Sequence, residues 1–323
     1  MKAIVYTQYG PPDVLQFKEI PMPTPADNEV LIRLCAASLN PLDWHIMRGK
    51  PFFLRLAGLG LRKPKCEVLG SDIAGRVEAV GKDVKRFQPG DEVFGGIGLG
   101  GFAEYVCAKE EKLALKPANL SFEEAAAVPI AAITALQGLR DKGRIGPDCK
   151  VLIEGASGGV GTFAVQIAKW FEAEVMAVCS TRNVQTARSL GADHVIDYTQ
   201  EDFTRSGRRY DLIFAANAHR SIFEYKRALN RGGVYVMAGG GRAQILQVML
   251  LGPFLRLPGG HTMSSMFARM NATDLDLLKD LLEAGRIVPV IDRRYPLSQT
   301  AEAIRYLEEG HAQGKVVLTV DLK

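Results

Sequence analysis

Residues 150–161 read Lys-Val-Leu-Ile-Glu-Gly-Ala-Ser-Gly-Gly-Val-Gly, a short apolar run that stops at a cluster of glycines. The run from Val151 to Ile153 predicts a buried strand. From Val160 onward the apolar residues recur at helical spacing, so an amphipathic helix should begin at the glycines. A strand, a glycine-rich turn and a helix in this order predict a parallel α/β unit.

The glycine-rich turn is also a candidate binding site. Without Cβ atoms, Gly158, Gly159 and Gly161 let the backbone approach a ligand closely. The free N–H groups and the positive dipole end of the following helix face the same turn and favour an anion. We therefore predict that a dinucleotide's pyrophosphate binds here, on Ser157, Gly158, Gly159, Val160 and Gly161. A tight turn that holds no ligand is the alternative that the spacing alone leaves open.

The next predicted strand, Glu174 to Cys179, bears on the choice of dinucleotide. Roughly 20 residues past the glycines, an NAD-binding protein usually has an acid for the ribose 2′-hydroxyl. This chain has Ser180, Thr181 and Arg182 there. Hydroxyls and a guanidinium can hydrogen-bond and neutralise a 2′-phosphate, so NADPH is predicted rather than NADH. A solvated arginine at a helix end is the alternative interpretation of Arg182.

Length and composition bound the class of protein. The 323 residues exceed what one compact core usually holds, and 47% are hydrophobic, so two domains are expected. A formal net charge of +4 does not indicate a nucleic-acid surface. The N-terminal residues lack the apolar core of a signal peptide, and no apolar run approaches the roughly 20 residues of a membrane span. The five cysteines form no close pair, which favours a reducing compartment, and we expect a cytoplasmic protein.

The order of apolar runs predicts how the two domains are arranged along the chain. Residues 1–122 contain short runs broken by Pro and Gly, which predicts a β-rich, barrel-like lobe. Strands at 151–153, 174–179, 194–198, 210–216 and 234–238 alternate with helices, which predicts a doubly wound parallel sheet over residues 123–284. After a helix at 274–284 the chain is β-rich again, at 288–291 and 316–320. Residues 285–323 should therefore rejoin the first lobe, so that the cofactor domain is inserted in the middle.

Six ordered blocks of sequence carry a family resemblance over nearly the whole chain. They are Ala-Ala-Ser-Leu-Asn-Pro-Leu-Asp (36–43), Gly-Ser-Asp-Ile-Ala-Gly-Arg-Val (70–77), Phe-Gln-Pro-Gly-Asp-Glu-Val (87–93), Gly-Ala-Ser-Gly-Gly-Val-Gly (155–161), Leu-Gly-Ala-Asp-His-Val-Ile-Asp-Tyr (190–198) and Gly-Lys-Val-Val-Leu (314–318). The chain resembles the zinc-independent quinone oxidoreductase branch of the medium-chain dehydrogenase/reductase superfamily, and looks most like its mitochondrial reticulon-interacting and chloroplast-envelope members.

The resemblance implies a fold and an activity. The fold would be α/β, with a GroES-like β-barrel catalytic domain, a doubly wound Rossmann domain and an active site in the cleft between them. The activity would be NADPH-dependent reduction of quinones, enones or related carbonyls. A homodimer formed through the cofactor-domain sheet is implied in the same way. A protein that binds NADPH for a regulatory or structural purpose, with little turnover, is the alternative.

The same resemblance places the candidate catalytic residues in the segment 40–45. Asn40 would donate to the substrate oxygen or fix the nicotinamide; a turn residue before Pro41 is its alternative. His45 stands where many relatives have tyrosine, and it could deliver a proton to an enolate or quinol oxygen, or simply be structural. Asp43 would orient His45 or cap a helix.

Further cofactor contacts follow only from the resemblance. It places Thr134 near the pyrophosphate, Tyr198 and Arg182 around the adenine ribose phosphate, and Lys315 on the substrate or nicotinamide side. It also places cofactor contacts at two strand ends: Asn217 after the fourth strand of the sheet, and Gly239 and Gly240 after the fifth. A core aromatic, a buried helix hydroxyl and a solvated lysine are the respective alternatives for Tyr198, Thr134 and Lys315.

Zinc is not expected. A catalytic zinc site needs three N, S or O ligands, and a structural site needs four closely spaced cysteines. In the frame of the family, the first zinc cysteine falls at Asn40 and the zinc histidine at Ser71. A structural site would lie between residues 90 and 115, and Cys107 is the only cysteine in that range.

Two apolar insertions, residues 51–61 and 245–257, bear on the substrate. Basic residues surround the first of them. They predict a lipophilic quinone or enone, and a peripheral membrane contact is a weaker hypothesis. Loops or short helices that pack on the rim of the cleft or in a dimer contact are the alternative.

Overall fold

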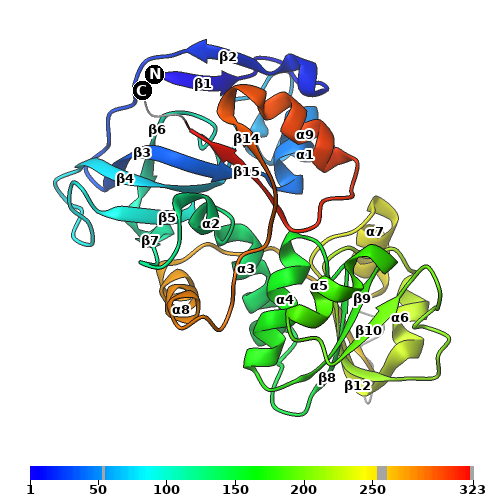
Figure 1. Cartoon of the computed structure of the whole chain (residues 1–323). Coiled ribbons are helices and arrows are strands. Elements are labelled where there is room, and N and C mark those ends of the chain that lie inside the picture. The colour runs from blue at the N-terminus through cyan, green and yellow to red at the C-terminus, as the bar shows by residue number, and fades with distance from the viewer. Residues whose placement is uncertain (53–54, 253–259, 321–323) are drawn as a thin grey trace. The chain divides into compact units, whose positions relative to one another are not determined.

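The computed structural model describes residues 1–52, 55–252 and 260–320, and it divides into two compact units. The first unit comprises Met1–Ile130, Met270–Gly285 and Pro289–Lys323. The second comprises Ala131–Arg269 and Arg286–Val288. Helix α3 (Pro129–Gln137) runs from the first unit into the second (Figure 1).

The second unit is built on one parallel sheet. Its strands are β8 (Lys150–Glu154), β9 (Glu174–Cys179), β10 (His194–Asp197), β11 (Tyr210–Ala215), β12 (Leu229–Met237) and β13 (Thr262–Ser265). They lie in the order β10-β9-β8-β11-β12-β13, and each neighbouring pair is parallel. In chain order this is 3-2-1-4-5-6, the strand order of a Rossmann domain, which confirms the predicted doubly wound sheet.

Helices alternate with these strands. They are α4 (Gly159–Trp170), α5 (Val184–Ser189), α6 (Ile222–Ala228) and α7 (Arg242–Leu251). The chain leaves the centre of the sheet in one direction through β9 and β10, and in the other through β12 and β13. Right-handed crossovers therefore place α4 and α5 on one face and α6 and α7 on the other. The connections after β8 and β11 therefore lead to opposite faces of the sheet. In doubly wound sheets, ligands bind at the carboxyl ends of the strands where two connections separate in this way.

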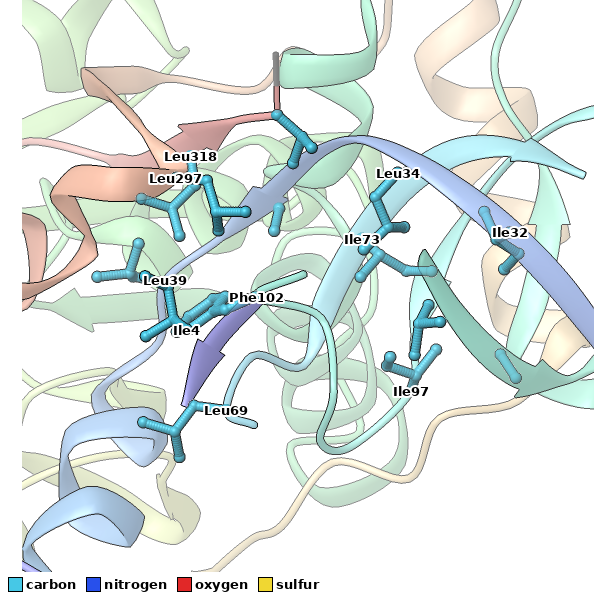
Figure 2. Packing of buried hydrophobic residues seen from close by; sticks show 14 of the residues in the cluster. Ile4, Ile32, Leu34, Leu39, Leu69, Ile73, Ile97, Phe102, Leu297 and Leu318 are labelled. Atoms are coloured by element: carbon cyan, nitrogen blue, oxygen red, sulfur yellow. The ribbon is translucent and has the colours of Figure 1, made fainter. Parts of the chain in front are cut away.

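The first unit is mainly antiparallel. Its strands are β1 (Lys2–Val5), β2 (Gln16–Glu19), β3 (Glu29–Ser38), β4 (Asp72–Val80), β5 (Glu92–Gly96), β6 (Tyr105–Lys109), β7 (Leu113–Leu115), β14 (Ile291–Pro296) and β15 (Lys315–Thr319). Strands β1 and β2 form a hairpin, and the others form one sheet in the order β14-β15-β3-β4-β5-β7, with β6 paired to β3. Figure 2 shows part of the core, where Leu34 of β3 lies beside Ile73 of β4. The C-terminal strands thus rejoin the N-terminal lobe, as expected.

Helices α1 (Pro41–Arg48), α2 (Phe122–Ala126), α8 (Ala272–Glu283) and α9 (Thr300–Glu308) belong to the first unit. The position of α8 differs from the predicted division, which placed residues 123–284 in the cofactor domain. Leu275, Leu278 and Leu282 are buried on its inner face, and the backbone carbonyl of Leu282 accepts a hydrogen bond from Asn119. Residues 123–130 and 270–284 therefore pack with the first unit.

One predicted strand is wrong in its placement. Residues 288–290 are not in a strand, and β14 begins only at Ile291. The side-chain amide of Gln166 bonds both the N–H and the C=O of Val288, at 2.8 and 2.9 Å. These bonds satisfy the backbone of Val288 without a neighbouring strand. Contact with β15 begins only at Val290, whose carbonyl accepts from the N–H of Lys315 at 2.8 Å.

The two apolar insertions are described in part. Residues 53–54 and 253–259 lie outside the described residues. Within the remainder, Phe52, Leu61, Leu246 and Met249 are more than half exposed. None of the helices in the described ranges is long and apolar enough to cross a bilayer. A membrane contact of these insertions stays a prediction.

Candidate active site

Three glycines at a spacing of three residues shape the turn after β8. Gly155 has a φ of +76°, which an L side chain rarely adopts, and it makes the turn possible. A Cβ on Gly161 would lie 2.0 Å from the Gly155 carbonyl oxygen, so this glycine lets α4 pack on the turn. A Cβ on Gly158 would meet only that oxygen, at 3.6 Å, so Gly158 faces open space. Our sequence reasoning overlooked Gly155, although the regular spacing of 155, 158 and 161 pointed to it.

The first turn of α4 is free of side-chain caps. Its N-cap is Gly158, and no described side chain accepts a hydrogen bond there. The helix is 12 residues long, so its dipole and its first N–H groups present positive charge to the turn. Ser157 and Val160 are half-buried beside it. This arrangement fits a phosphate group, because backbone donors and the space above Gly158 coincide.

The structure brings Asn217, Gly239 and Gly240 to the same end of the sheet. A Cβ on Gly155 would lie 3.1 Å from the Cβ of Asn217, so the turns after β8 and β11 touch. The N–H of Ala218 donates to the carbonyl of Gly239 at 2.8 Å, which joins the loop after β12 to them. Three loops at the point where the strand order reverses therefore form one surface. Thr134 lies buried on α3 in the same unit.

The residues after β9 differ from the prediction in one respect. Arg182 and Tyr198 are exposed, and Ser180 is half-buried and accepts a hydrogen bond from Asn183. The hydroxyl of Thr181 donates to the carboxylate of Asp197 at 2.5 Å, and this bond lowers the pKa of Asp197. An acid is therefore present at this edge, at the end of β10 instead of β9.

Asp197 was missed because it belongs to the neighbouring strand. In the parallel register, Asp197 is the partner of Cys179, so the ends of β9 and β10 coincide. The signal that could have found it is the block Val-Ile-Asp-Tyr, which ends the next strand. Of the groups proposed to hold a 2′-phosphate, the Thr181 hydroxyl is engaged by Asp197, and Ser180, Arg182 and Tyr198 remain candidates.

In the first unit, a buried lysine organises a second polar cluster. The ammonium of Lys315 donates to the Leu39 carbonyl at 3.0 Å, to Asn40 Oδ1 at 2.8 Å and to Asp72 Oδ2 at 3.2 Å. Lys315 is 3% exposed and Asp72 is fully buried. The three N–H donors of the ammonium thus all have partners, so Lys315 is not the solvated lysine of the alternative interpretation.

Asn40 is held on both sides of its amide. Its Oδ1 accepts from Lys315, and its Nδ2 donates to Asp72 at 2.9 Å. A side-chain amide has two N–H donors, and this network uses one of them. Asp72 also accepts from the Ser38 hydroxyl and the N–H of Ile130. The sequence reasoning missed Asp72; the signal was a carboxylate within an apolar run, which is costly unless it is paired.

Asp43 caps α1, as one of its two predicted roles required. Its Oδ2 accepts from the N–H of Asn40, the N-cap residue, at 2.7 Å. Burial raises the pKa of Asp43 to about 7, and its Oδ1 has no hydrogen-bond partner among the described residues. The bond to Asn40 joins this carboxyl to the cluster around Lys315.

His45 lies on α1, half-buried. Its ring stacks on Trp44, with centroids 3.6 Å apart. Its Nδ1 lies 3.1 Å from the carbonyl oxygen of Lys50. Because a carbonyl only accepts, this contact favours the proton on Nδ1, and the ring can then release a proton from Nε2 only as the imidazolium.

A hollow of about 490 Å³ elsewhere in the second unit contains none of the candidate residues. It is lined by Thr204, Arg205, Gly207, Arg208, Arg209 and Arg227. The segment that lines it leads into β11, so the hollow lies towards the amino end of that strand, whereas the glycine turn follows the carboxyl end of β8.

Comparison with known proteins identifies the family. Residues 26–118 match the family described as alcohol dehydrogenase GroES-like domain, and residues 190–318 match the family described as zinc-binding dehydrogenase. The chain is 35% identical to a chloroplast envelope quinone oxidoreductase homolog from Arabidopsis thaliana, over 98% of both proteins. The chain belongs to the medium-chain dehydrogenase/reductase superfamily.

Other members of the superfamily agree in sequence and in fold. The NADPH-dependent alkenal/one oxidoreductase of Arabidopsis thaliana chloroplasts is 35% identical over 98% of this chain and 79% of its own. The quinone oxidoreductase from Coxiella burnetii has a TM-score of 0.88, with 31% identity and 99% of both chains covered. The fold is thus the predicted GroES-like domain with a Rossmann domain, and this medium-chain dehydrogenase/reductase is an oxidoreductase.

Zinc, which one matched family name implies, does not fit the residues of this superfamily member. Asn40, at the position of a zinc ligand, bonds the Lys315 ammonium, which would repel a cation. Ser71, at the position of another, donates its hydroxyl to the Gly98 carbonyl. No cluster of three or more His, Cys, Asp or Glu side chains within residues 1–52, 55–252 and 260–320 could hold a metal ion. That the protein works without a metal stays a prediction.

Proposed function

We propose that the chain is an NADPH-dependent reductase that transfers hydride to a lipophilic quinone or α,β-unsaturated carbonyl. The observation that supports this best is the uncapped first turn of α4 beside the open space at Gly158. The names of two relatives, a quinone oxidoreductase homolog and an alkenal/one oxidoreductase, support the substrate class.

In this proposal the second unit holds the dinucleotide. The N–H groups at the start of α4 bind the pyrophosphate, and Asn217, Gly239 and Gly240 border it. Ser180, Arg182 and Tyr198 bind the 2′-phosphate by charge-assisted hydrogen bonds. A bound NADPH supplies the hydride.

The first unit supplies the group that stabilises the reduced oxygen. The second N–H of the Asn40 amide donates to that oxygen as negative charge develops on it. Lys315 and Asp72 fix the amide plane, so the donor is oriented before the reaction begins. His45 then delivers the proton that completes the reduction.

A panel of acceptors tests the proposal directly. Oxidation of NADPH and of NADH is followed optically against quinones, enones, enals and simple aldehydes, on metal-free protein. Turnover of quinones or enones with NADPH is expected. Tight NADPH binding with no acceptor reduced would favour the alternative, a regulatory NADPH-binding protein, and stoichiometric bound zinc would favour an alcohol dehydrogenase.

Replacement of Arg182 by Ala tests the choice of dinucleotide. Loss of one charge-assisted hydrogen bond should weaken NADPH binding by roughly 1.5–3 kcal/mol and leave NADH binding nearly unchanged. The measurement is the Kd of each dinucleotide by titration. Arg188→Ala, which removes another exposed arginine of the same βα unit, is the control and should alter neither Kd. Equal losses for NADPH and NADH in Arg182→Ala would remove the assignment to the 2′-phosphate.

Replacement of His45 by Phe tests the proton donor. Phe preserves an aromatic ring against Trp44 but cannot protonate, so kcat should fall by roughly 10²-fold or more while the NADPH Kd changes little. His45→Gln, which keeps hydrogen bonding without an imidazolium, should show a similar loss. Unchanged turnover in both variants would leave His45 a structural residue.

A further inference from the structure

A buried carboxyl group lies directly at the glycine turn and has no part in the function proposed so far. Glu154 is the last residue of β8 and precedes Gly155. It is 6% exposed, in a strand whose other inner residues are apolar. A carboxyl in such surroundings is costly unless a partner compensates for its lost hydration.

The partner is the hydroxyl of Tyr225, on α6. It donates to Glu154 Oε2 at 2.5 Å and accepts from the N–H groups of His219 and Arg220, each at 3.1 Å. Tyr225 is 1% exposed and stacks on Tyr235, with ring centroids 4.4 Å apart. The phenol therefore connects the carboxyl of Glu154 rigidly to the backbone of the loop between β11 and α6.

That loop contains Asn217, one of the candidate cofactor residues. The backbone carbonyl of Glu154 accepts from the N–H of Ala216 at 3.0 Å, so Glu154 holds the loop on one side of Asn217 through its backbone and on the other through Tyr225. The N–H of Ala218 donates to the carbonyl of Gly239, so the loop after β12 is joined to the loop that Glu154 holds. A change at Glu154 would reach three of the loops that border the proposed cofactor site.

We propose that Glu154 is a positioning residue of the cofactor site, which holds Asn217 through Tyr225 and takes up a proton when the dinucleotide binds. This inference rests on the proposed function, because it presupposes an anionic dinucleotide at the glycine turn. It adds a residue and a proton linkage that the proposed function does not contain.

The charges around Glu154 favour such a linkage. The pKa of Glu154 is raised to about 7, chiefly by burial; the Tyr225 hydroxyl and the Arg220 guanidinium oppose this rise, and Glu224 adds to it. Tyr235, which stacks on Tyr225, stays protonated because burial and Glu154 raise its own pKa. Near neutral pH, Glu154 is therefore divided between its charged and neutral forms.

The sign of the linkage follows from like charges. A pyrophosphate at the turn adds negative charge near Glu154, which disfavours the carboxylate and raises the pKa of Glu154 in the complex. The complex then holds more protons than the free protein above about pH 7, so affinity for the dinucleotide falls as pH rises through that range. For a single proton the decrease is at most about tenfold per pH unit.

Two substitutions separate the charge of Glu154 from the hydrogen bonds by which Tyr225 holds the loop. Glu154→Gln retains an oxygen that accepts from Tyr225 but cannot titrate, so NADPH affinity should become nearly independent of pH between 7 and 9 and should resemble the wild-type value at low pH. Tyr225→Phe removes the bond to the loop but leaves the carboxyl, so affinity should fall several-fold at every pH. It should still depend on pH, with the dependence moved to higher pH, because the hydroxyl that lowers the pKa of Glu154 is gone. Tyr306→Phe, which breaks a tyrosine–carboxylate bond to Asp292 in the first unit, is the matched control and should change neither property.

The experiment is the NADPH Kd of the four proteins at intervals from pH 6 to 9, by calorimetric titration. The 2′-phosphate of NADPH itself titrates near pH 6, and comparison with Glu154→Gln removes this contribution. In parallel, the side-chain carboxyl carbon of Glu154 is followed by NMR in the wild-type protein with and without NADPH, which gives a readout independent of any variant's folding and of turnover. A pKa near 7 that rises on binding is the expected result.

The outcomes distinguish this inference from the proposed function. An equal pH dependence in Glu154→Gln and wild type, or a Glu154 resonance whose titration NADPH does not shift, overturns the proton linkage. Unchanged affinity in Tyr225→Phe overturns the positioning role. Absence of NADPH binding to the wild type at every pH overturns the proposed function itself, and the linkage with it.

Discussion

Replacement of Lys315 by Met should destabilise the protein by about 3–5 kcal/mol, because it leaves the carboxylate of Asp72 buried without its cation. The Lys315 and Asp72 side chains are 4% and 0% exposed, and the atoms of the pair lie 3.2 Å apart. Met has a similar volume, so the loss comes from charge and not from a cavity. The free energy of unfolding in denaturant is the measurement. Turnover should fall as well, since Asn40 loses the bond that orients its amide.

Two further variants show whether the loss comes from an uncompensated charge. Lys315→Met combined with Asp72→Asn removes both charges and should recover a large part of the stability. Lys169→Met, which breaks a pair with Asp193 whose side chains are about a third exposed, should cost less than about 1 kcal/mol. If Lys315→Met were no more harmful than Lys169→Met, the buried cluster would not be an important source of stability.

Substitution of Gly161 by Ala should also have a large effect, and Gly158→Ala is its matched comparison. A Cβ at Gly161 would lie 2.0 Å from the Gly155 oxygen and 2.7 Å from the Ala156 Cα, both backbone atoms that cannot swing aside. A loss of about 3 kcal/mol of stability is expected, together with loss of dinucleotide binding. Denaturant unfolding and NADPH titration measure the two effects.

Gly158→Ala should weaken NADPH binding with little loss of stability. The new Cβ would meet only one atom, at 3.6 Å, so stability should change by less than about 1 kcal/mol. NADPH affinity should nevertheless fall at least about tenfold, because the methyl group occupies the space where a phosphate approaches the backbone. A Gly158→Ala protein that binds NADPH as the wild type does would place the dinucleotide elsewhere.

The sequence predicted correctly those helices, strands and turns that depend on residues close together in the chain. Apolar residues at helical or strand spacing predicted the alternation of β8, α4 and β9, and glycine, with its unusual backbone freedom, predicted the turn between them. The parallel direction of the strands followed, because a helix between two strands returns the chain to the end of the sheet where the first strand began. Where the local pattern was ambiguous the prediction was less accurate: the apolar run at 288–291 was placed in a strand, whereas Gln166 bonds Val288 and the strand begins only at Ile291.

The residues of the candidate site divide in the same way, into those that the sequence identified and those that it missed. Ser157, Gly158 and Gly161 could be chosen from the sequence because they lie within one short motif. Asp72 and Glu154 were missed, because a carboxyl among apolar residues indicates that a partner is needed but not which residue supplies it. Lys315 is 243 residues from Asp72, and Tyr225 is 71 residues from Glu154.

Asp197 shows how the tertiary structure also changes an interpretation. From the sequence, the end of β9 had no acid, and this absence favoured NADPH. The parallel pairing of β9 with β10 brings the Asp197 carboxylate to Thr181. The preference for NADPH therefore rests on Ser180, Arg182 and Tyr198, and no longer on the absence of an acid.

The strand, turn and helix at 150–170 and the doubly wound sheet could be read from the sequence alone, because periodicity and glycine content act over a few residues. The superfamily was indicated separately, by the resemblance of six ordered sequence blocks. The long-range contacts of the site appear only in the folded chain: Lys315 and Asp72 each bond one side of the Asn40 amide, and Tyr225 joins Glu154 to the loop of Asn217. Buried polar groups must find partners wherever the fold brings them, and those partners are set by strand order and not by distance along the chain.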